Sequence, residues 1–444
     1  MKGLPSVGFE IYEQMVKADP SSFWKSYQEA LKEVEASPAK YKGKPVEFLY
    51  QPFFITEAQW KDLEKISVTM LEITKKVTER YLTEPDYRRL FGFNDLMEAL
   101  ILKDPGYHYA VPMTRIDVFY DFDGRFQFCE INTDGSSGMT ECRELQRIIG
   151  ASPSIQALPL DELELKEGEF FKSWTAAFLE NYWEFSGEKN FPNVAIIDWF
   201  QDEVPSEFIE FQKAFEASGC PARIVDVREL SYSEGKLKDG DFSIDAVYRR
   251  LVSWEAVGRY PDTKALTDAY LDGNVCVIGP FRSQIPHNKR FFAVLHNEGT
   301  NDFLEPEEKA FIRDHIPYTA ILDKDNSSQW QEWIDHKHHY IIKPEDLYAS
   351  SGVYAGQDYS VEEWKRLLEK ASSQNYLIQQ YCHVPRMPMA MFEKGKVTFE
   401  EQQYLMGCFV YNEKFQGPYI RTGRKSIIGS VVECYTVPAY RVKK

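Results

Sequence analysis

A hairpin at residues 113–132 constrains this chain more than any other segment. The Asp-Gly pair at 123–124, flanked by alternating apolar residues, is the signal of a two-residue turn, and such a turn fixes the register of both strands by counting outward. The count pairs Phe122 with Arg125, Val118 with Cys129, Asp117 with Glu130, and Arg115 with Asn132. One face then carries side chains that can enter a core, namely Ile116, Val118, Cys129 and Ile131.

The opposite face of this hairpin places two carboxylates across from each other. Like charges on neighbouring strands repel unless a positive group lies between them. Carboxylate and amide oxygens are the ligands that Mg²⁺ prefers. We therefore expect Asp117, Glu130 and Asn132 to bind a metal ion, with Arg115 beside them. An ordinary hairpin with a solvated acidic face is the alternative, and a turn longer than two residues would shift the register.

The length and charge of the chain favour a multidomain enzyme over a nucleic-acid-binding protein. With 444 residues, of which 43% are hydrophobic and 15% aromatic, the chain can bury more than one core. Its formal charge is −17 and its pI is about 5.1. A nucleic-acid-binding protein needs a basic surface to displace counterions from phosphates, so this class is not expected.

The cysteines and the apolar runs indicate the compartment. Seven cysteines are widely spaced and form no Cys-x-x-Cys pair, so neither a zinc site nor a disulfide framework is expected. No apolar run reaches about 18 residues, and the amino terminus lacks the apolar core of a signal peptide. We expect a cytoplasmic protein without a membrane partner.

Changes of pattern divide the chain into four segments. Apolar residues recur every three or four positions at about 8–36 and 56–81, which predicts amphipathic helices. The predicted segments are a helical layer at 1–110, the hairpin with a following helix at 111–190, a βαβ unit at 191–290, and alternating strands and helices at 291–444.

The βαβ unit is predicted from two buried apolar runs. Residues 194–198 and 222–226 read as strands, and 205–218 between them as a helix that ends before a glycine. Such a unit implies a parallel sheet, which a strand at 246–251 could extend. No Gly-x-Gly-x-x-Gly follows the first strand, so dinucleotide binding is not supported.

A polar loop links the hairpin to a predicted helix at 139–149. The loop reads Asp-Gly-Ser-Ser-Gly at 134–138. Backbone N–H groups at a helix start can bind an anion, so a substrate carboxylate could lie at Ser136 and Ser137. An ordinary connection with a serine N-cap is the alternative.

Two lysines in the second half of the chain stand where phosphates could bind. Lys343 ends an apolar strand at 340–344, and a Ser/Gly loop follows at 350–356. Such a loop can fold over a polyphosphate while the lysine neutralises its charge. Lys289, in an Asn-Lys pair, is a weaker candidate. The alternatives are a strand-end lysine with a solvated ammonium and an ordinary turn.

The order of these groups resembles the ATP-grasp superfamily, and within it the circularly permuted branch that includes the synthetase domain of glutathionylspermidine synthase. In that branch Arg-x-Asp and Glu-x-Asn precede the lysines, as 115–117 and 130–132 do here. The further matches are Lys289, Lys343, the loop 350–356, the segment 378–381 and Gly417-Pro-Tyr-Ile-Arg421. The likeness covers most of residues 110–430.

The resemblance implies an α+β or α/β protein with a circularly permuted ATP-grasp fold. Its core would comprise 111–190, with the metal hairpin and substrate segment, and 291–444, with the nucleotide-binding part. A βαβ pre-ATP-grasp domain at 191–290 and the N-terminal helical layer would be added to it.

The resemblance also implies an ATP-dependent carboxylate–amine ligase that forms an amide through an acylphosphate and uses ATP and Mg²⁺. The implied site residues are Asp117, Glu130 and Asn132 for the metal; Lys289, Lys343, Ser350, Ser351, Gly352, Gln379, Gln380 and Tyr381 for the nucleotide; Arg115 and Arg421 for catalysis; and Ser136 and Ser137 for the substrate.

Some features depart from that family. The loop at 350–356 has fewer glycines than a typical ATP-grasp lid, and the substrate segment begins with Gly135, which leaves room for an acyl substrate other than glutathione. The first 110 residues hold no counterpart of the amidase domain that accompanies some of these synthetases.

Several readings of the function stay open. The expected partners are a small-molecule carboxylate, as a peptide or amino acid, and an amine. The alternatives are a catalytically idle ATP-binding regulatory module, a phosphotransferase, and a structural or interaction protein. The sequence identifies neither substrate and does not indicate the oligomeric state.

Overall fold

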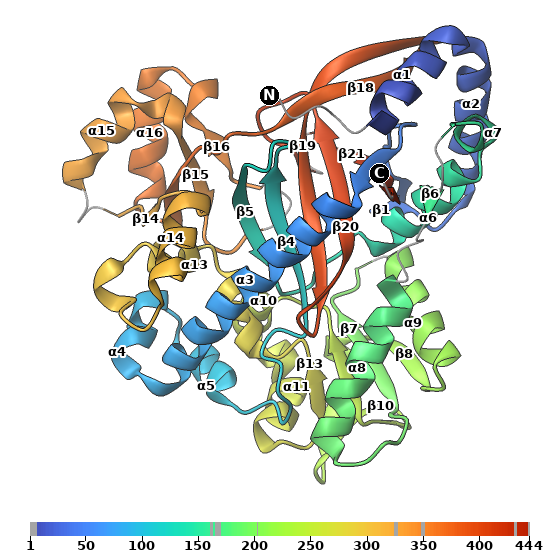
Figure 1. The fold of residues 1–444 in the computed structure, drawn as a ribbon. Helices are drawn as coiled ribbons and strands as arrows, with labels where there is room; N and C mark the ends of the chain where they lie inside the picture. The colour runs from blue at the N-terminus through green and yellow to red at the C-terminus, as the bar shows by residue number, and fades with distance from the viewer. Residues whose placement is uncertain are drawn as a thin grey trace.

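A six-stranded antiparallel sheet lies at the centre of the computed structural model, which describes residues 7–159, 163–164, 170–201, 203–323, 327–347, 351–429 and 433–442 (Figure 1). Its strand order is β21-β20-β19-β4-β5, and β18 pairs with β19. The strands are β4 (Met113–Tyr120), β5 (Phe126–Asn132), β18 (Arg386–Glu393), β19 (Lys396–Tyr411), β20 (Lys414–Gly423) and β21 (Tyr435–Val437). The sheet therefore joins the predicted hairpin to the carboxyl-terminal part of the chain.

The hairpin β4–β5 differs from its prediction at two points that cancel. Asp121 N donates to Arg125 O and Gly124 N to Asp121 O, so the loop has three residues and not two. This loop moves the register by one residue and makes the predicted pairs of Phe122 with Arg125 and Val118 with Cys129 wrong.

A β-bulge at Cys129 restores the register. One extra residue on β5 opposes the step between Asp117 and Val118, and Val118 pairs with Phe128 instead. The predicted pairs of Asp117 with Glu130 and Arg115 with Asn132 are confirmed. Phe128 takes the core position predicted for Cys129, which lines a cavity.

The predicted βαβ unit is confirmed as part of a four-stranded parallel sheet. Its order is β13-β12-β7-β8, and all three pairings are parallel. The elements are α8 (Phe170–Ser186), β7 (Val194–Asp198), α9 (Ser206–Ala217), β8 (Ala222–Asp226), β12 (Ala246–Arg249), α10 (Ser253–Gly258), α11 (Tyr260–Asp272) and β13 (Cys276–Ile278). A small sheet of β9 (Leu230–Ser233), β10 (Lys236–Asp239) and β11 (Phe242–Ile244) is inserted between β8 and β12.

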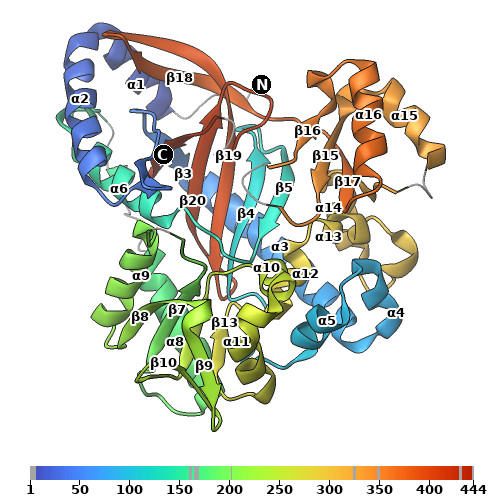
Figure 2. The ribbon, with the colours of Figure 1, turned by 180° about the vertical axis from the view of Figure 1, so that it is seen from behind.

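A third sheet lies beside the β5 edge of the central sheet (Figure 2). Its order is β14-β17-β15-β16, and a separate apolar cluster that includes Trp333 and Trp364 packs behind it. The elements are α12 (Gln284–His287), α13 (Arg290–Leu295), α14 (Pro306–His315), β14 (Thr319–Ile321), α15 (Trp330–Asp335), β15 (Tyr340–Pro344), β16 (Tyr354–Ala355), α16 (Val361–Ala371) and β17 (Tyr376–Gln380).

Helices of the N-terminal segment pack on the central sheet. Helix α3 (Glu57–Thr83) contacts β19 and β20 and starts with a capping box between Thr56 and Gln59. The predicted helix at 8–36 is interrupted, because Pro20 starts a new helix capped by Asp19. The remaining elements of this segment are α1 (Val7–Ala18), α2 (Pro20–Ala36), β1 (Lys40–Tyr41), β2 (Lys44–Pro45), β3 (Phe53–Thr56), α4 (Pro85–Arg88) and α5 (Asp95–Leu102).

The last elements close the fold around the central sheet. Helix α6 (Met139–Gly150) follows the hairpin, and β22 (Ala439–Val442) pairs in parallel with β3. Helix α7 (Pro153–Gln156) and strand β6 (Leu163–Glu164) complete this region. Within the described residues, no helix combines the length and the apolar character needed to cross a bilayer.

Candidate functional site

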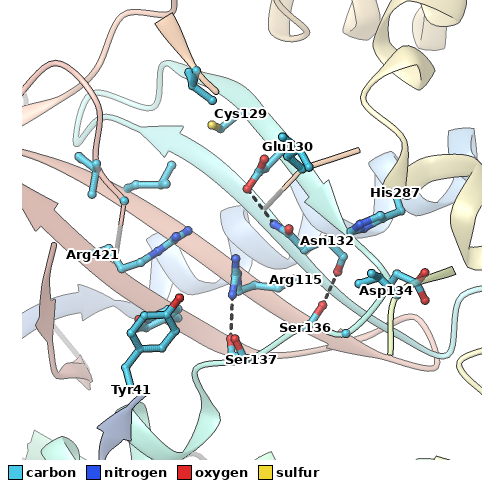
Figure 3. Close-up of a pocket in the computed structure, with 18 of the residues that line it drawn as sticks. Tyr41, Arg115, Cys129, Glu130, Asn132, Asp134, Ser136, Ser137, His287 and Arg421 are labelled. Atoms are coloured by element: carbon cyan, nitrogen blue, oxygen red, sulfur yellow. Dashed lines mark hydrogen bonds between the residues drawn. The ribbon is translucent and has the colours of Figure 1, made fainter. Parts of the chain in front are cut away.

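A cavity of about 1430 Å³ is lined by residues from the central sheet, from the parallel sheet β13-β12-β7-β8 and from the sheet β14-β17-β15-β16. Strands β4, β5 and β20 contribute side chains to its lining (Figure 3). Strands β15 and β17 and the loops after β7 and β12 contribute others. We call it the central cavity. The predicted site residues that line it are Arg115, Glu130, Asn132, Ser136, Ser137, Lys289, Lys343, Gln379, Gln380, Tyr381 and Arg421.

Asp117 holds two arginines together on the floor of the cavity. Its carboxylate is fully buried and accepts hydrogen bonds from Arg115 Nε at 2.8 Å and Arg421 Nη2 at 2.5 Å. Arg115 Nη2 and Asn132 Nδ2 also donate to it, each at 3.2 Å. Asp117 does not line the cavity itself, so its predicted role as a metal ligand would require these pairs to rearrange.

Gly407 makes room for this ion pair. In the central sheet Gly407 on β19 lies between Asp117 on β4 and Tyr419 on β20. A Cβ at this position would lie 2.8 Å from Arg115 Cδ and 2.9 Å from Asp117 Oδ1. The two guanidiniums lie over the ring of Tyr419, with Cζ at 5.7 Å for Arg115 and 5.2 Å for Arg421. No local pattern around Gly407 indicates this role, because it depends on the pairing of β19 with strands far away in the chain.

Glu130 and Asn132 face the cavity from β5. Asn132 Nδ2 donates to Glu130 Oε1 at 3.3 Å, and Lys289 Nζ lies 3.5 Å from Glu130 Oε2. Burial alone would raise the pKa of Glu130, but Lys289, Lys343 and the two arginines outweigh it and lower the pKa to about 2. Glu130 is therefore a carboxylate at every physiological pH.

Lys343, which was predicted to bind a phosphate, is enclosed at the cavity wall. Its side chain is buried, and Nζ lies 3.4 Å from Cys129 O and 3.9 Å from Cys129 Sγ. Cys129, at the bulge, lines the cavity (Figure 3), and the contact with its Sγ places it beside this lysine. Lys289 Nζ donates to Leu347 O at 2.9 Å. The two predicted phosphate lysines thus both lie close enough to Glu130 to lower its pKa.

The residues Gln379, Gln380 and Tyr381, which were predicted to bind the nucleotide, line the cavity from β17 and the residue after it. Gln379 Nε2 donates to Thr319 Oγ1 at 2.9 Å, and its buried Oε1 has no hydrogen-bond partner within the described residues. Tyr381 Oη donates to Ser426 O at 2.7 Å. Ser351 and Gly352 do not line the cavity, and Ser350 lies outside the described residues.

The start of α6 differs from the predicted anion site. Glu207 Oε2 on α9 accepts hydrogen bonds from the backbone N–H groups of residues 138, 139 and 140, at 3.1, 2.9 and 3.2 Å. A protein carboxylate therefore takes the place that was expected for a substrate anion, and Gly138 stands at the N-cap in place of a serine. Glu207 Oε1 also pairs with Arg250 at 3.1 Å.

Ser136 and Ser137, which precede α6, line the cavity and form hydrogen bonds with neighbouring residues. Ser136 Oγ donates to Asn132 O at 2.5 Å, and Arg115 Nη1 donates to Ser137 O at 2.7 Å. Arg250 Nη1 donates to Ser136 O. The serine hydroxyl predicted for substrate at 136 thus already has a backbone partner, whereas Ser137 is exposed to the cavity.

Sequence reasoning missed several polar groups of the lining. His287 lies beside Asp134, and burial lowers the pKa of its imidazole to about 4, so it is neutral at pH 7. Burial also raises the pKa of Asp198, at the end of β7, to about 6. Glu141 accepts a hydrogen bond from Tyr419 at 2.6 Å. His287 and Asp198 lie far along the chain from the hairpin, and Glu141 reaches the site through its contact with the distant Tyr419, so no local pattern could have linked these groups to the site.

Two of the three predicted metal ligands, Glu130 and Asn132, line the cavity and suit a hard divalent cation, whereas Asp117 does not line it. Among the residues that the structure describes, no three histidine, cysteine, aspartate or glutamate side chains gather as a metal group. Glu130 and Asn132 offer one carboxylate and one amide oxygen toward the cavity. Mg²⁺ is commonly bound by one or two carboxylates together with substrate phosphates and water, so these two residues suit it.

The comparisons with known proteins concern the fold. No protein-family model and no curated protein matches the chain. A glutathione synthetase-like effector from Globodera pallida, solved in its apo form, aligns over 96% of this chain and 98% of its own, with a TM-score of 0.64 and 12% identity. A putative gamma-glutamylcysteine synthetase from Methylobacillus flagellatus aligns over 85% of this chain and 87% of its own, with a TM-score of 0.42 and 9% identity. At this identity the first likeness shows that the chain has the mixed α/β fold of the glutathione synthetase-like effector.

Proposed function

We propose that this chain is an ATP-dependent ligase that joins a carboxylate to an amine, with ADP and phosphate as the other products. The observation that carries the proposal is the convergence of Glu130, Lys289, Lys343 and the Arg115 and Arg421 pair on one cavity, although these residues lie far apart along the chain. Carboxylate activation by ATP needs alignment and charge neutralisation more than it needs a protein nucleophile.

Lys289 and Lys343 would bind the nucleotide phosphates. Both ammonium groups line the cavity beside Glu130, and Lys343 is buried, where a point charge acts more strongly than it does in water. Gln379 and Tyr381, with the neighbouring Gln380, would lie along the adenine. The buried Oε1 of Gln379, which has no hydrogen-bond partner among the residues that the structure describes, could accept a hydrogen bond from an adenine amino group.

Glu130 and Asn132 would hold Mg²⁺ at the phosphates. When bound, Mg²⁺ supplies neutralisation of the phosphate charge. Asp117 could join them only by releasing an arginine, so in this structure its contribution is to orient Arg115 and Arg421.

The two arginines would stabilise the charge that develops during the reaction. An oxygen of the substrate carboxylate attacks the γ-phosphorus, and the bond from that phosphorus to the bridging oxygen of ADP breaks. The amine then attacks the acyl carbon and phosphate leaves, with loss of a proton from nitrogen. Arg115 and Arg421 are fixed by Asp117 and Tyr419, so they can bind the developing oxyanion without reorganising.

The proposal extends to the arrangement of the fold, the acyl substrate and the location of the protein. The fold would be a circularly permuted ATP-grasp arrangement, divided into the segments 1–110, 111–190, 191–290 and 291–444. The acyl substrate would be related to that of glutathionylspermidine synthase, and the protein would be cytoplasmic. The hairpin precedes both phosphate lysines in the chain, and this order supports the permuted arrangement.

A nucleotide-turnover assay tests the proposal. ADP release from Mg·ATP is measured with a panel of carboxylates and amines, for wild type and for Lys343→Met, with Lys365→Met on α16 as the control. We expect release that needs both substrates and falls at least about 100-fold in Lys343→Met only. Binding of ATP without turnover would favour the idle module, and turnover with a carboxylate alone would favour the phosphotransferase.

A further inference from the structure

Two surface segments with exposed residues line one side of the central cavity. One is the hairpin β1–β2, whose strands are joined at Lys42 and Gly43, and the other is the stretch 203–209 at the start of α9. Ser206 Oγ donates to Pro38 O at 2.5 Å and ties the two segments together. We call the six residues Lys40, Tyr41, Lys42, Lys44, Val204 and Ile209, all of which line the cavity, its mouth.

The mouth carries uncompensated positive charge. Within the described part of the chain, none of its three lysines forms an ion pair with a carboxylate, and Lys42 Nζ lies over the ring of Tyr41 at 5.5 Å. Glu203, which lies near Gly43, is the acidic residue closest to this hairpin turn in the cavity lining. The whole lining has nine lysines and arginines against six aspartates and glutamates, although the protein has a net charge of −17. Such a reversal of sign indicates an anionic ligand.

The mouth also exposes apolar side chains. Seven large hydrophobic side chains are exposed in the described residues, and four of them line this cavity: Tyr41, Val204, Ile209 and Leu347. The three at the mouth are 37%, 39% and 41% exposed. Because exposed apolar residues that gather at one place mark binding surfaces, the mouth is expected to contact an apolar group as well as an anion.

The mouth lies on the side of the cavity that carries the arginine pair. Tyr41 and Glu141 both line the cavity, and the negative charge of Glu141 adds to the effect of burial in raising the pKa of Tyr41. Glu141 binds Tyr419, on which Arg115 and Arg421 lie. Figure 3 shows Tyr41 on the side of the cavity where Arg115, Arg421 and Ser137 lie. The mouth and the arginine pair therefore line the same side of the central cavity.

We propose that the acyl substrate is a peptide that enters through the mouth, with its reacting carboxylate at Arg115 and Arg421, an acidic side chain on the lysines, and an apolar side chain on Tyr41 and Ile209. This inference rests on the proposed function. The cavity volume of about 1430 Å³ exceeds the roughly 300–1,000 Å³ of a pocket for one small molecule, which leaves room for a peptide beside a nucleotide.

Peptide binding tests this proposal without any need for turnover. Three short fluorescein-labelled peptides with a free carboxyl terminus are compared by fluorescence anisotropy: one with two glutamates and a leucine, one with glutamines in place of the glutamates, and one with serine in place of the leucine. The proteins are wild type, Lys40→Glu/Lys42→Glu, Ile209→Ser, and Lys236→Glu/Lys238→Glu on β10 as the control for charge.

We expect the acidic, leucine-containing peptide to bind wild type at least about ten-fold more tightly than either relative. The preference for glutamate should vanish in Lys40→Glu/Lys42→Glu, and the preference for leucine should fall in Ile209→Ser, while the control keeps both. Equal binding of the three peptides, or none, overturns the proposal, and so does binding to phosphatidylserine vesicles that depends on Lys40 and Lys42 without binding of peptides. ADP release by wild type with small carboxylates would then leave the proposed ligase function standing.

Discussion

Arg421 Nη2 lies 2.5 Å from Asp117 Oδ2, and this carboxylate, which is fully buried, also holds Arg115. One negative charge therefore fixes two guanidiniums that were predicted for catalysis. The pairing means that the acidic residue of the Arg-x-Asp motif acts on the arginines in this structure, while the carboxylate that faces the cavity is Glu130.

Asp117→Asn should destabilise the protein strongly. It leaves two enclosed guanidiniums without a counter-charge, which costs about 3–5 kcal/mol for a buried pair. Glu130→Gln is the matched comparison, because the Glu130 side chain is 27% exposed and water can replace part of its contacts. Urea unfolding monitored by circular dichroism measures both variants. A smaller loss in Asp117→Asn than in Glu130→Gln would show that the arginines do not depend on Asp117.

Gly407→Ala should displace the arginine pair without filling any cavity. The added Cβ would lie under 3.0 Å from side-chain atoms of Arg115 and Asp117. We expect a loss of about 1–3 kcal/mol in unfolding free energy and a fall in the rate of ADP release that exceeds the change in the KM for ATP. Full activity in the purified variant would contradict the assigned packing of β19 beneath the site.

Glu207→Gln should loosen the start of α6. The carboxylate accepts three backbone N–H groups and pairs with Arg250, which is buried. Loss of its charge should lower the unfolding free energy by about 2–4 kcal/mol. Glu216→Gln, on the exposed face of the same helix, should leave it within about 0.5 kcal/mol. Equal effects of the two changes would mean that Glu207 contributes no more than a surface residue.

Asp198 should make stability depend on pH. Burial raises the pKa of its carboxyl from 3.8 to about 6, and Glu255 and Asp226 act in the same direction, against the Trp199 N–H and Arg250. Folding therefore favours the protonated form, and this stability is present below pH 4 and lost as the pH rises through about 6.

Asp198→Asn removes that dependence. The variant should exceed wild type in unfolding free energy at pH 7.5, by at most about 3 kcal/mol, and match it near pH 4. Denaturation series at both pH values measure the difference. A difference that stays constant with pH would remove Asp198 as its source.

The sequence predicted what depends on local patterns. The strands β7, β8 and β15 begin and end where the apolar runs do, because short buried strands are recorded in contiguous residues. The pairing of Asp117 with Glu130 was also predicted. It is correct only because two deviations from the predicted hairpin, a longer turn and a bulge at Cys129, cancel each other. Neither deviation has a signal in the residues around it that counting from the turn can read.

The rest of the site depends on contacts between distant segments. Strand β19 brings Gly407 beneath Asp117, and α9 brings Glu207 to the start of α6. Antiparallel pairing over nearly 300 residues is decided by the packing of the whole chain, and local sequence does not record it. For the same reason the sequence did not indicate that the lysines of the β1–β2 hairpin line the cavity.

The mass of the reaction products tests the central claim most directly. The protein is incubated with ATP, Mg²⁺ and a pooled metabolite extract, and new compounds are identified by mass spectrometry while ADP and phosphate are counted. We predict a product whose mass equals that of a carboxylate plus an amine minus water, formed in equal number with ADP and phosphate. A phosphorylated compound as the final product, or bound ATP with no new compound, would contradict the assignment as a ligase.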